Sequence, residues 1–280
     1  MRDYVKGLMV QGTASSVGKS LVCTAICRLL ANEGKRVAPF KSQNMSSLSI
    51  HTEEGFEVSV SQALQARAAK TAYLTEMNPI LLKPVRKMET DLIILGKKEN
   101  RMNGMKYREQ FFEEGINLIK KSLSTLSESY EYLILEGAGS PVEVNLMDRE
   151  LVNMRVADIA DVPVLLVANI EYGGVFASVV GTLALLPEAQ RARVKGIFIN
   201  KFRGEVSLFQ DGIDFIENYT GIEVLGVIPY FENELEEEDG DVQKDKTASD
   251  EQINAWANHF REHVKWGRIL ELIENNEVYE

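Results

Sequence analysis

Residues 7–20 read Gly-Leu-Met-Val-Gln-Gly-Thr-Ala-Ser-Ser-Val-Gly-Lys-Ser, an apolar run followed by a loop with two glycines and a Lys-Ser pair. The run predicts a strand, and the residues after Lys19 continue with the apolar spacing of a helix. A strand, a glycine loop and a helix in this order form a phosphate-binding loop, because backbone N–H groups and the helix N-terminus then point at the anion. Lys19 would neutralise the terminal phosphates, and the Ser20 hydroxyl would bind Mg²⁺.

The spacing of this loop departs from the strict phosphate-binding pattern. Five residues separate Gly12 from the Gly-Lys pair instead of four, and Thr13 stands at the nominal glycine position. The order of strand, loop and helix still favours phosphate binding over a chance match to Gly-Lys-Ser. The expected cofactor-binding residues of the loop are Gly12, Thr13, Ala14, Ser15, Ser16, Val17, Gly18, Lys19 and Ser20.

Apolar runs alternate with helical stretches over the first 230 residues. Several runs are hydrophobic almost throughout, as parallel strands covered on both faces are. The alternation predicts an α/β fold with a doubly wound, mostly parallel sheet. The expected strands are 7–10, 36–40, 91–95, 132–135, 162–168, 196–200 and 224–228, and the expected helices are 19–32, 60–73, 106–126, 175–186 and 210–219.

An acidic segment follows the last expected strand. Residues 232–245 include eight acids and one lysine, with almost nothing that can pack, so we interpret them as a solvated linker. The expected organisation is a nucleotide-binding domain at 1–230, the acidic linker at 231–248 and a helical tail at 249–280. The tail is expected to dock on its own domain, although its apolar stripe also fits another subunit or a membrane surface. That stripe consists of Ile253, Trp256, Phe260, Val264 and Ile273.

Composition excludes several classes of function. The chain of 280 residues is 45% hydrophobic, enough for a large core. Most of its net charge of −11 comes from the acidic segment, and no basic stripe offsets it, so we expect no nucleic-acid partner. The longest apolar runs are far shorter than the ~20 residues that span a bilayer, and no leader pattern precedes the loop. We therefore expect a cytoplasmic protein without membrane contact. Cys23 and Cys27 lie four apart in an apolar stretch and are expected to be core residues.

A second chemical signal follows the run 132–135. Glu136 and the Gly-Ala-Gly after it lie at the predicted carboxyl edge of the sheet, where open α/β folds bind ligands. Glu136 would there hold Mg²⁺ across from Ser20, directly or through water; the alternative is a solvated turn residue. Cations near expected strand ends would bind phosphates and substrate carboxylates at the same edge. These cations are Lys41, Lys83, Lys201 and Arg203.

Several longer strings resemble the ATP-dependent amidoligase domain of the cobyric acid synthase family, whose fold is related to that of dethiobiotin synthetase. The resemblance covers about residues 5–230, and the five-residue loop spacing is normal in this family. It implies a P-loop NTPase fold of the dethiobiotin synthetase type. The strings are Gln-Gly-Thr at 11–13, Val-Gly-Lys-Ser at 17–20, Pro-Phe-Lys-Ser-Gln-Asn-Met at 39–45, Met-Asn-Pro-Ile-Leu-Leu-Lys-Pro at 77–84, Glu-Gly-Ala-Gly-Ser-Pro at 136–141, Val-Asn-Met-Arg-Val-Ala at 152–157, Gly-Gly-Val-Phe-Ala at 173–177, Lys-Gly at 195–196 and Ile-Asn-Lys-Phe-Arg-Gly at 199–204.

The resemblance implies a function in cobalamin biosynthesis. The family uses ATP to amidate peripheral carboxylates of a corrinoid, a cobyrinic acid diamide, through an acyl phosphate that ammonia attacks. The loop would hold ATP, and Mg²⁺ would be bound by Ser20 and Glu136. By the same resemblance, Lys19, Lys41, Gln43 and Asn44 would be catalytic, Asn200 would contact adenine, and Asn153 and Arg155 would bind substrate beside Lys83.

The chain departs from the family pattern at two strings. The family has Glu-Ile-Gly-Arg-Ala-Gln where residues 57–62 read Glu-Val-Ser-Val-Ser-Gln, so Val60 replaces an arginine. It has Asp-Ile-Asp-Arg-Gly-Gly where residues 169–174 read Asn-Ile-Glu-Tyr-Gly-Gly, so Asn169 replaces an acid and Tyr172 an arginine. These changes would shift the substrate or weaken Mg²⁺ binding.

A further departure concerns the source of ammonia. The family continues into a glutaminase domain with a Cys-His-Glu triad, but here no cysteine follows Cys27 and the only histidines are His51, His259 and His263. Residues 254–263 resemble the family's C-terminal end, so we expect a member that lacks the glutaminase domain, with the acidic segment at the join. Ammonia would then come from solution or from a separate glutaminase subunit, for which the stripe around Trp256 is the first surface to test.

Two other functions also fit the sequence. One is a different carboxylate- or amine-activating ligase of the dethiobiotin synthetase type. The other is a non-catalytic ATPase switch of the partitioning type. Such switches carry a second lysine early in the loop, where this chain has Ala14, which disfavours the switch.

Overall fold

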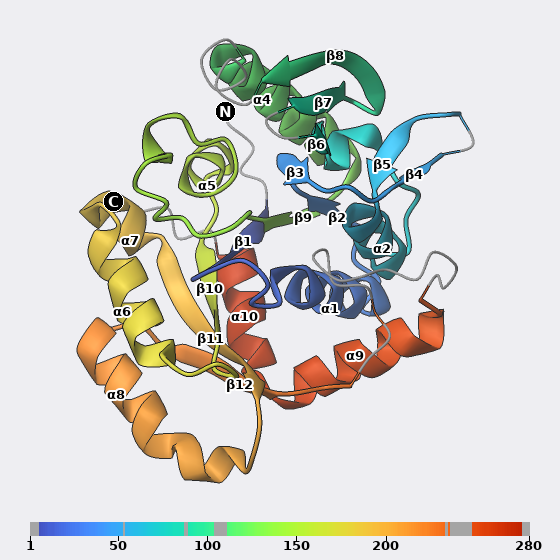
Figure 1. Ribbon diagram of the computed structural model, residues 1–280. Coiled ribbons are helices and arrows are strands. Elements are labelled where there is room, and N and C mark those ends of the chain that lie inside the picture. Colours follow the sequence, from blue (N-terminus) through green and yellow to red (C-terminus); the bar gives the residue numbers. More distant parts are fainter. Residues whose placement is uncertain are drawn as a thin grey trace.

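The computed structural model describes residues 6–52, 54–86, 89–103, 111–232, 235 and 248–275. Its main sheet has six strands, and every neighbouring pair is parallel. From the central β1 the chain passes to β2 at one edge, returns to β9 between them, and then crosses to β10, β11 and β12 at the other edge (Figure 1). The connections after β1 and β9 therefore leave in opposite directions, which places the topological switch point between these two neighbouring strands. In spatial order the strands are β12 (Val224–Pro229), β11 (Val194–Phe202), β10 (Val164–Asn169), β1 (Lys6–Gly12), β9 (Tyr132–Glu136) and β2 (Val37–Phe40).

Helices cover both faces of this sheet, which confirms the doubly wound α/β prediction. Alternate residues of β1 serve opposite cores: Leu8 and Val10 pack with one set of helices, and Met9 packs with the other. Figure 1 shows α1 and α10 on one side of the sheet and α6 and α8 on the other. The first face carries α1 (Lys19–Asn32), α9 (Asp250–Glu262) and α10 (Trp266–Glu274), and the second carries α4 (Phe112–Ser129), α5 (Met154–Ala160), α6 (Val175–Leu185) and α8 (Gln210–Thr220).

The expected strand at 91–95 exists but is not part of the main sheet. It is β7 (Glu89–Ile94), which pairs antiparallel with β6 (Ile80–Arg86) and β8 (Lys97–Asn103). β3 (Gln43–Met45) pairs parallel with β6 and joins this second sheet to the end of β2. The prediction that 91–95 adds a strand to the main sheet is therefore wrong, because an apolar run does not reveal which strand it pairs with. A hairpin of β4 (Ser49–His51) and β5 (Glu57–Ser59) lies beside it.

The remaining helices end close to the predicted positions, with two differences. The helix expected at 60–73 is α2 (Val60–Ala68), which ends early because Lys70 has a left-handed backbone with φ of 54°. The first residues of the helix expected at 106–126 lie outside the described residues. Short helical turns occur at η1 (Thr75–Met77), η2 (Met147–Arg149), α7 (Glu188–Ala192) and η3 (Val206–Phe209).

The expected helical tail forms two helices, α9 and α10, that pack on the nucleotide-binding core. Ser249 caps α9 in a reciprocal capping box with Gln252. Ile253, Trp256 and Phe260 are buried in one core with α1. The apolar stripe is therefore an internal contact and not an open docking surface for a separate subunit. Most of the acidic linker lies outside the described residues, and the three segment boundaries stay a prediction.

Candidate functional site

The glycine loop between β1 and α1 has the backbone that its sequence predicts. Ser16 and Gly18 have positive φ angles, 55° and 99°, which turn the chain into the first turn of α1. A Cβ at Gly12 would lie 2.6 Å from a methyl group of Val17, and one at Gly18 would lie 2.2 Å from Nδ2 of Asn200. Both glycines are therefore required by close packing, and Gly18 also by its backbone angle.

Asn200 braces this loop from β11. Its side chain is buried, and Nδ2 donates a hydrogen bond to the Val17 carbonyl oxygen at 2.8 Å. The structure thus places Asn200 beside the loop. Its predicted contact with adenine stays a prediction.

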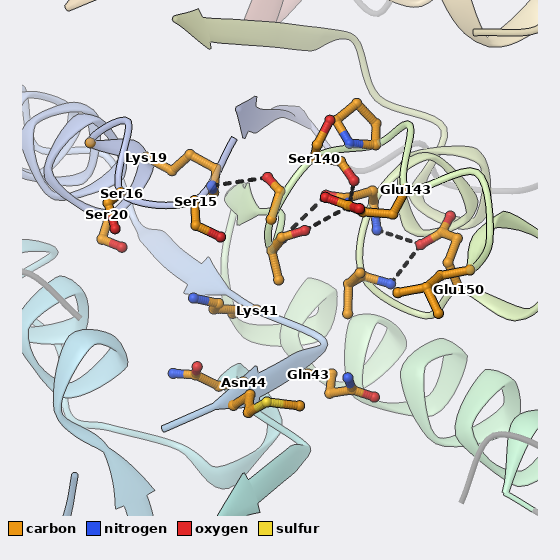
Figure 2. A pocket seen from close by; sticks show the side chains of 18 of the residues that line it. Ser15, Ser16, Lys19, Ser20, Lys41, Gln43, Asn44, Ser140, Glu143 and Glu150 are labelled. Atoms are coloured by element: carbon orange, nitrogen blue, oxygen red, sulfur yellow. Dashed lines mark hydrogen bonds between the residues drawn. The ribbon is translucent and has the colours of Figure 1, made fainter. Parts of the chain in front are cut away.

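Lys19 lies in the first turn of α1 and reaches back across the loop. Its Nζ donates to the carbonyl oxygens of Ala14 at 2.9 Å and Gly139 at 3.1 Å. The side chain is only 7% exposed. It joins the glycine loop to the loop after β9, so the two strongest sequence motifs meet at this ammonium group (Figure 2).

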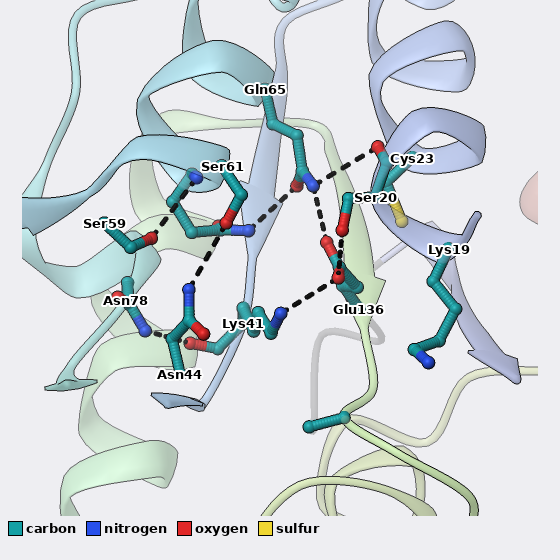
Figure 3. Close-up of polar contacts among 12 residues, drawn as sticks. Lys19, Ser20, Cys23, Lys41, Asn44, Ser59, Ser61, Gln65, Asn78 and Glu136 are labelled. Atoms are coloured by element: carbon teal, nitrogen blue, oxygen red, sulfur yellow. Dashed lines mark hydrogen bonds and ion pairs between the residues drawn. The ribbon is translucent and has the colours of Figure 1, made fainter. Parts of the chain in front are cut away.

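Glu136 is the centre of a buried polar cluster (Figure 3). Its Oε1 accepts hydrogen bonds from Ser20 Oγ at 2.8 Å and from Lys41 Nζ at 3.0 Å. Burial by itself would raise the pKa of this carboxyl, but the Lys41 ammonium and the hydrogen bonds from Gln65 and Ser20 outweigh burial and hold the pKa below its ordinary value. Glu136 is therefore an ionised carboxylate at the end of β9 in contact with the loop serine, and its binding of Mg²⁺ stays a prediction.

The sequence interpretation missed Gln65. This residue of α2 donates from Nε2 to Glu136 Oε2 at 2.5 Å, and its Oε1 accepts from Gln62 Nε2 at 2.9 Å. Both glutamines are fully buried. The sequence feature that could have identified Gln65 is a pair of glutamines about one helical turn apart, set among mostly small or apolar residues.

A cavity of about 420 Å³ opens between the two loops (Figure 2). Three of the predicted catalytic residues, Lys41, Gln43 and Asn44, line it where β2 runs into β3. Asn44 is buried and donates from Nδ2 to Ser61 Oγ at 3.3 Å. Among the residues that the structure describes, the lining consists of Ser15, Ser16, Gly18, Lys19, Ser20, Leu21, Lys41, Gln43, Asn44, Met45, Ala138, Gly139, Ser140, Pro141, Glu143, Leu146, Met147, Glu150, Val152 and Asn153.

The predicted substrate-binding residues differ in their position relative to the cavity. Asn153 lines the cavity, but its Nδ2 donates to the carbonyl oxygens of Ala138 and Ser140, at 2.8 and 3.1 Å, so the side chain braces the loop after β9. Arg155 is not among the lining residues. It donates to the Asp148 carbonyl oxygen at 3.2 Å and stacks on an aromatic ring.

Lys83 does not lie at the carboxyl edge of the main sheet, so that expectation is corrected. It lies within β6 of the second sheet, where Nζ contacts the carboxylate of Glu57 and donates to Ser49 Oγ at 2.8 Å. Burial raises the pKa of Glu57, but hydrogen bonds from Lys83 and Ser49 outweigh it and lower the pKa overall. Lys83 is not among the cavity-lining residues, because the strand continues past it instead of ending there.

The residues at the predicted Mg²⁺ site would supply only some of the ligands of the ion and would not enclose it. The described part of the chain holds no group of three or more His, Cys, Asp or Glu side chains able to bind a metal. Ser20 and Glu136 contact each other directly beside the cavity. A hard cation held here would take its other ligands from phosphate oxygens and water, as Mg²⁺ does in phosphoryl-transfer sites.

The three departures from the family pattern have distinct positions. Val60 is the first residue of α2. The Asn169 side chain turns back on its own loop and accepts from the Glu171 backbone N–H at 2.8 Å. Tyr172 is 87% exposed. None of the three lines the cavity.

Comparison with known proteins accounts for this arrangement. Residues 8–242 match the model of the CobQ/CobB/MinD/ParA nucleotide-binding domain, CbiA. The chain belongs to this family. The glycine loop and Glu136 are therefore parts of a P-loop nucleotide-binding domain, and the fold expected from the sequence resemblance is confirmed. Among the described residues, no helix has the length and hydrophobicity needed to cross a membrane.

Several curated relatives of this chain are named cobyric acid synthase. The chain is 53% identical over 223 residues to the cobyric acid synthase of Geobacillus thermodenitrificans, an alignment that covers 80% of this chain and 45% of the relative. It is 53% identical over 232 residues to that of Anoxybacillus flavithermus, covering 83% and 46%, and 49% identical over 251 residues to that of Crocosphaera subtropica, covering 89% and 51%. The resemblance to cobyric acid synthases is confirmed, and the chain spans about half the length of these relatives.

Proposed function

We propose that this protein is an ATP- and Mg²⁺-dependent amidoligase that acts on corrinoid carboxylates of the cobyrinic acid diamide type, in cytoplasmic cobalamin biosynthesis. The observation that carries the proposal is the convergence of Lys19, Lys41, Gln43 and Asn44 on one cavity beside the glycine loop. Relatives named cobyric acid synthase support the substrate class.

The proposed chemistry needs two displacements. A carboxylate oxygen of the corrinoid attacks the γ-phosphorus of ATP and the bond to ADP breaks, which gives an acyl phosphate. Ammonia then attacks the acyl carbon, inorganic phosphate leaves and a proton is lost, which gives the amide. Because both steps bring anions together, positioning and charge neutralisation supply most of the rate acceleration.

The residues at the cavity suit these tasks. Lys19, between the two loops, would neutralise the transferring phosphate, and the loop N–H groups would bind its oxygens. Lys41 lies at the end of β2 and would offset charge between the phosphate and the substrate carboxylate, with Gln43 and Asn44 as hydrogen-bond donors. Mg²⁺ bound near Ser20 and Glu136 would neutralise the phosphate charge further.

We propose that the ammonia comes from outside this chain. Cys23 and Cys27 are both completely buried in α1. Burial raises the pKa of both thiols, that of Cys23 and that of Cys27, so neither is a nucleophilic thiolate near neutral pH. The chain has no other cysteine with which to hydrolyse glutamine.

An amidation assay tests this function. Purified protein is incubated with ATP, Mg²⁺ and a corrinoid acid, with either ammonium or glutamine, and amides are counted by mass spectrometry. We expect amide from ammonium only, at a rate that rises with pH as the NH₃ fraction grows. A panel of smaller carboxylates and diamines serves as the control for a ligase of the dethiobiotin synthetase type.

Two results would contradict separate parts of the proposal. ATP turnover stimulated only by the smaller substrates would overturn the corrinoid assignment. Amide formed from glutamine by protein free of contaminating glutaminase would overturn the external source of ammonia.

A further inference from the structure

The two oxygens of the Glu136 carboxylate have different partners. Oε1 accepts from both Ser20 Oγ and Lys41 Nζ, whereas Oε2 accepts from Gln65 Nε2. Ser20 and Lys41 line the cavity, while Gln65 approaches from α2 on the other side (Figure 3). The hydrogen bond from Gln65 therefore fixes the plane of the carboxylate, with one oxygen directed at Ser20 and Lys41.

A second amide sets the orientation of Gln65. An ionised carboxylate only accepts hydrogen bonds, so Gln65 must turn its NH₂ group toward Glu136 and its carbonyl oxygen away. That oxygen accepts from Gln62 Nε2 at 2.9 Å. Gln62 is itself anchored at the start of α2, where its backbone N–H donates to the capping Ser59 Oγ at 3.3 Å.

Because these side chains are buried, the order of donors and acceptors along this chain of hydrogen bonds is fixed. Gln62, Gln65 and Glu136 are at most 1% exposed, so bulk water does not compete for these groups. Among the described residues, Oε1 of Gln62 has no hydrogen-bond partner. Turning the Gln62 amide around would supply that oxygen to Gln65 in place of the NH₂ group, and would set two carbonyl oxygens against each other.

We propose that Gln65, oriented by Gln62, is a positioning residue that aims the Glu136 carboxylate at Ser20 and so prepares the site for the Mg²⁺–nucleotide complex. The inference rests on the proposed function, because it concerns the metal that this function requires. Neither glutamine lines the cavity; Gln65 contacts the site through Glu136 and, at 3.5 Å, through the backbone carbonyl oxygen of Ser20.

The test compares variants that remove one amide at a time and keep its length. Gln65→Met removes the donor to Glu136, and Gln62→Met removes the group that orients Gln65. Thr182→Val, which removes a buried hydroxyl on α6 that bonds to the Ser178 carbonyl oxygen, is the matched control. Binding of a fluorescent ATP analogue is measured across a Mg²⁺ titration and again in EDTA, and melting curves verify folding.

We expect Gln65→Met to raise the half-saturating Mg²⁺ concentration roughly tenfold, the usual effect of losing a group that orients a metal ligand. Affinity without Mg²⁺ should stay within about twofold of the wild type, because the backbone N–H groups and Lys19 of the glycine loop, which bind the phosphates, are retained. Gln62→Met should show a smaller shift in the same direction. The double variant should match Gln65→Met alone, since Gln62 acts only through Gln65.

Several outcomes would overturn the inference. Equal losses of affinity with and without Mg²⁺ would show a merely structural role, and additive effects in the double variant would break the link between the two amides. If Gln65→Met does not fold, an unchanged Mg²⁺ dependence in Gln62→Met overturns the inference by itself. A wild-type protein whose nucleotide affinity ignores Mg²⁺ would instead overturn the proposed function, and this inference with it.

Discussion

Trp256 donates its indole N–H to the carbonyl oxygen of Leu21 at 2.6 Å, which ties α9 to the first turn of α1 across 235 positions of sequence. Leu21 comes two residues after Lys19, so the tail packs directly behind the glycine loop. The Trp256 ring is 2% exposed and belongs to the core shared by α1, α9 and the sheet. The tail helices are thus part of the framework that supports the nucleotide site.

Trp256→Phe should destabilise the protein without changing its fold. It keeps most of the aromatic packing but removes the indole donor to the Leu21 carbonyl oxygen, and one such hydrogen bond contributes about 0.5–1.5 kcal/mol. Urea denaturation measures this free energy of unfolding. Trp266→Phe is the matched control: its indole donates to the exposed Glu33 at 3.0 Å, where water can replace it, so its loss should be smaller. Equal losses of stability in the two variants would contradict a specific contribution from the buried hydrogen bond between Trp256 and Leu21.

Lys19→Ala should abolish tight ATP binding in a folded protein. The loop keeps its N–H groups but loses the ammonium that joins it to Gly139 and faces the phosphates. Isothermal titration with ATP measures the affinity. Lys83→Ala is the control, because Lys83 is paired with Glu57 outside the cavity and should leave ATP affinity within about twofold of the wild type. Wild-type affinity in Lys19→Ala would refute the assignment of the loop.

Glu136→Gln should lower both stability and turnover. The substitution keeps the shape but leaves the buried Lys41 ammonium without its counter-charge, and breaking such a pair costs about 3–5 kcal/mol. Turnover should fall sharply, with nucleotide binding retained at high Mg²⁺. The double variant Lys41→Met, Glu136→Gln should be more stable than Glu136→Gln alone, as urea denaturation would show. Unchanged turnover and Mg²⁺ dependence in Glu136→Gln would rule out its predicted role.

The protein should become less stable as the pH falls, because His259 of α9 is partly buried. Burial lowers the pKa of this imidazole below 6.5; the hydrogen bond to the Pro229 carbonyl and Glu262 oppose the shift, and His263 adds to it. The unfolded chain therefore binds the proton more readily, and the free energy of unfolding should fall as the pH drops from about 6.5 through the folded-state pKa.

His259→Gln provides the comparison for this pH dependence. Glutamine can still donate to the Pro229 carbonyl oxygen, which the His259 ring contacts at 3.1 Å, but it does not titrate. Urea denaturation between about pH 5 and 7.5 should show a shallower decline in stability for the variant than for the wild type. Parallel pH profiles for the two proteins would assign the decline to another group.

The amino-acid sequence by itself determined the features that depend on neighbours along the chain. The strand before Gly12, the loop up to Ser20 and the carboxylate at the end of β9 follow from local hydrophobic patterning and from backbone conformations that glycine permits. Because parallel strands bring their carboxyl ends to one edge, the meeting of Ser20 and Glu136 was also predictable.

The tertiary structure alone decided which distant groups become partners. Gln65 contacts Glu136 across 71 positions, Lys83 pairs with Glu57 instead of reaching the cavity, and the strand at 91–95 joins the second sheet. Trp256 likewise packs inward where its helical stripe allowed a partner subunit. Hydrophobic periodicity specifies which face of an element is buried but not what covers it, and the pairing of a polar side chain depends on strand register and on the packing of helices far apart in sequence.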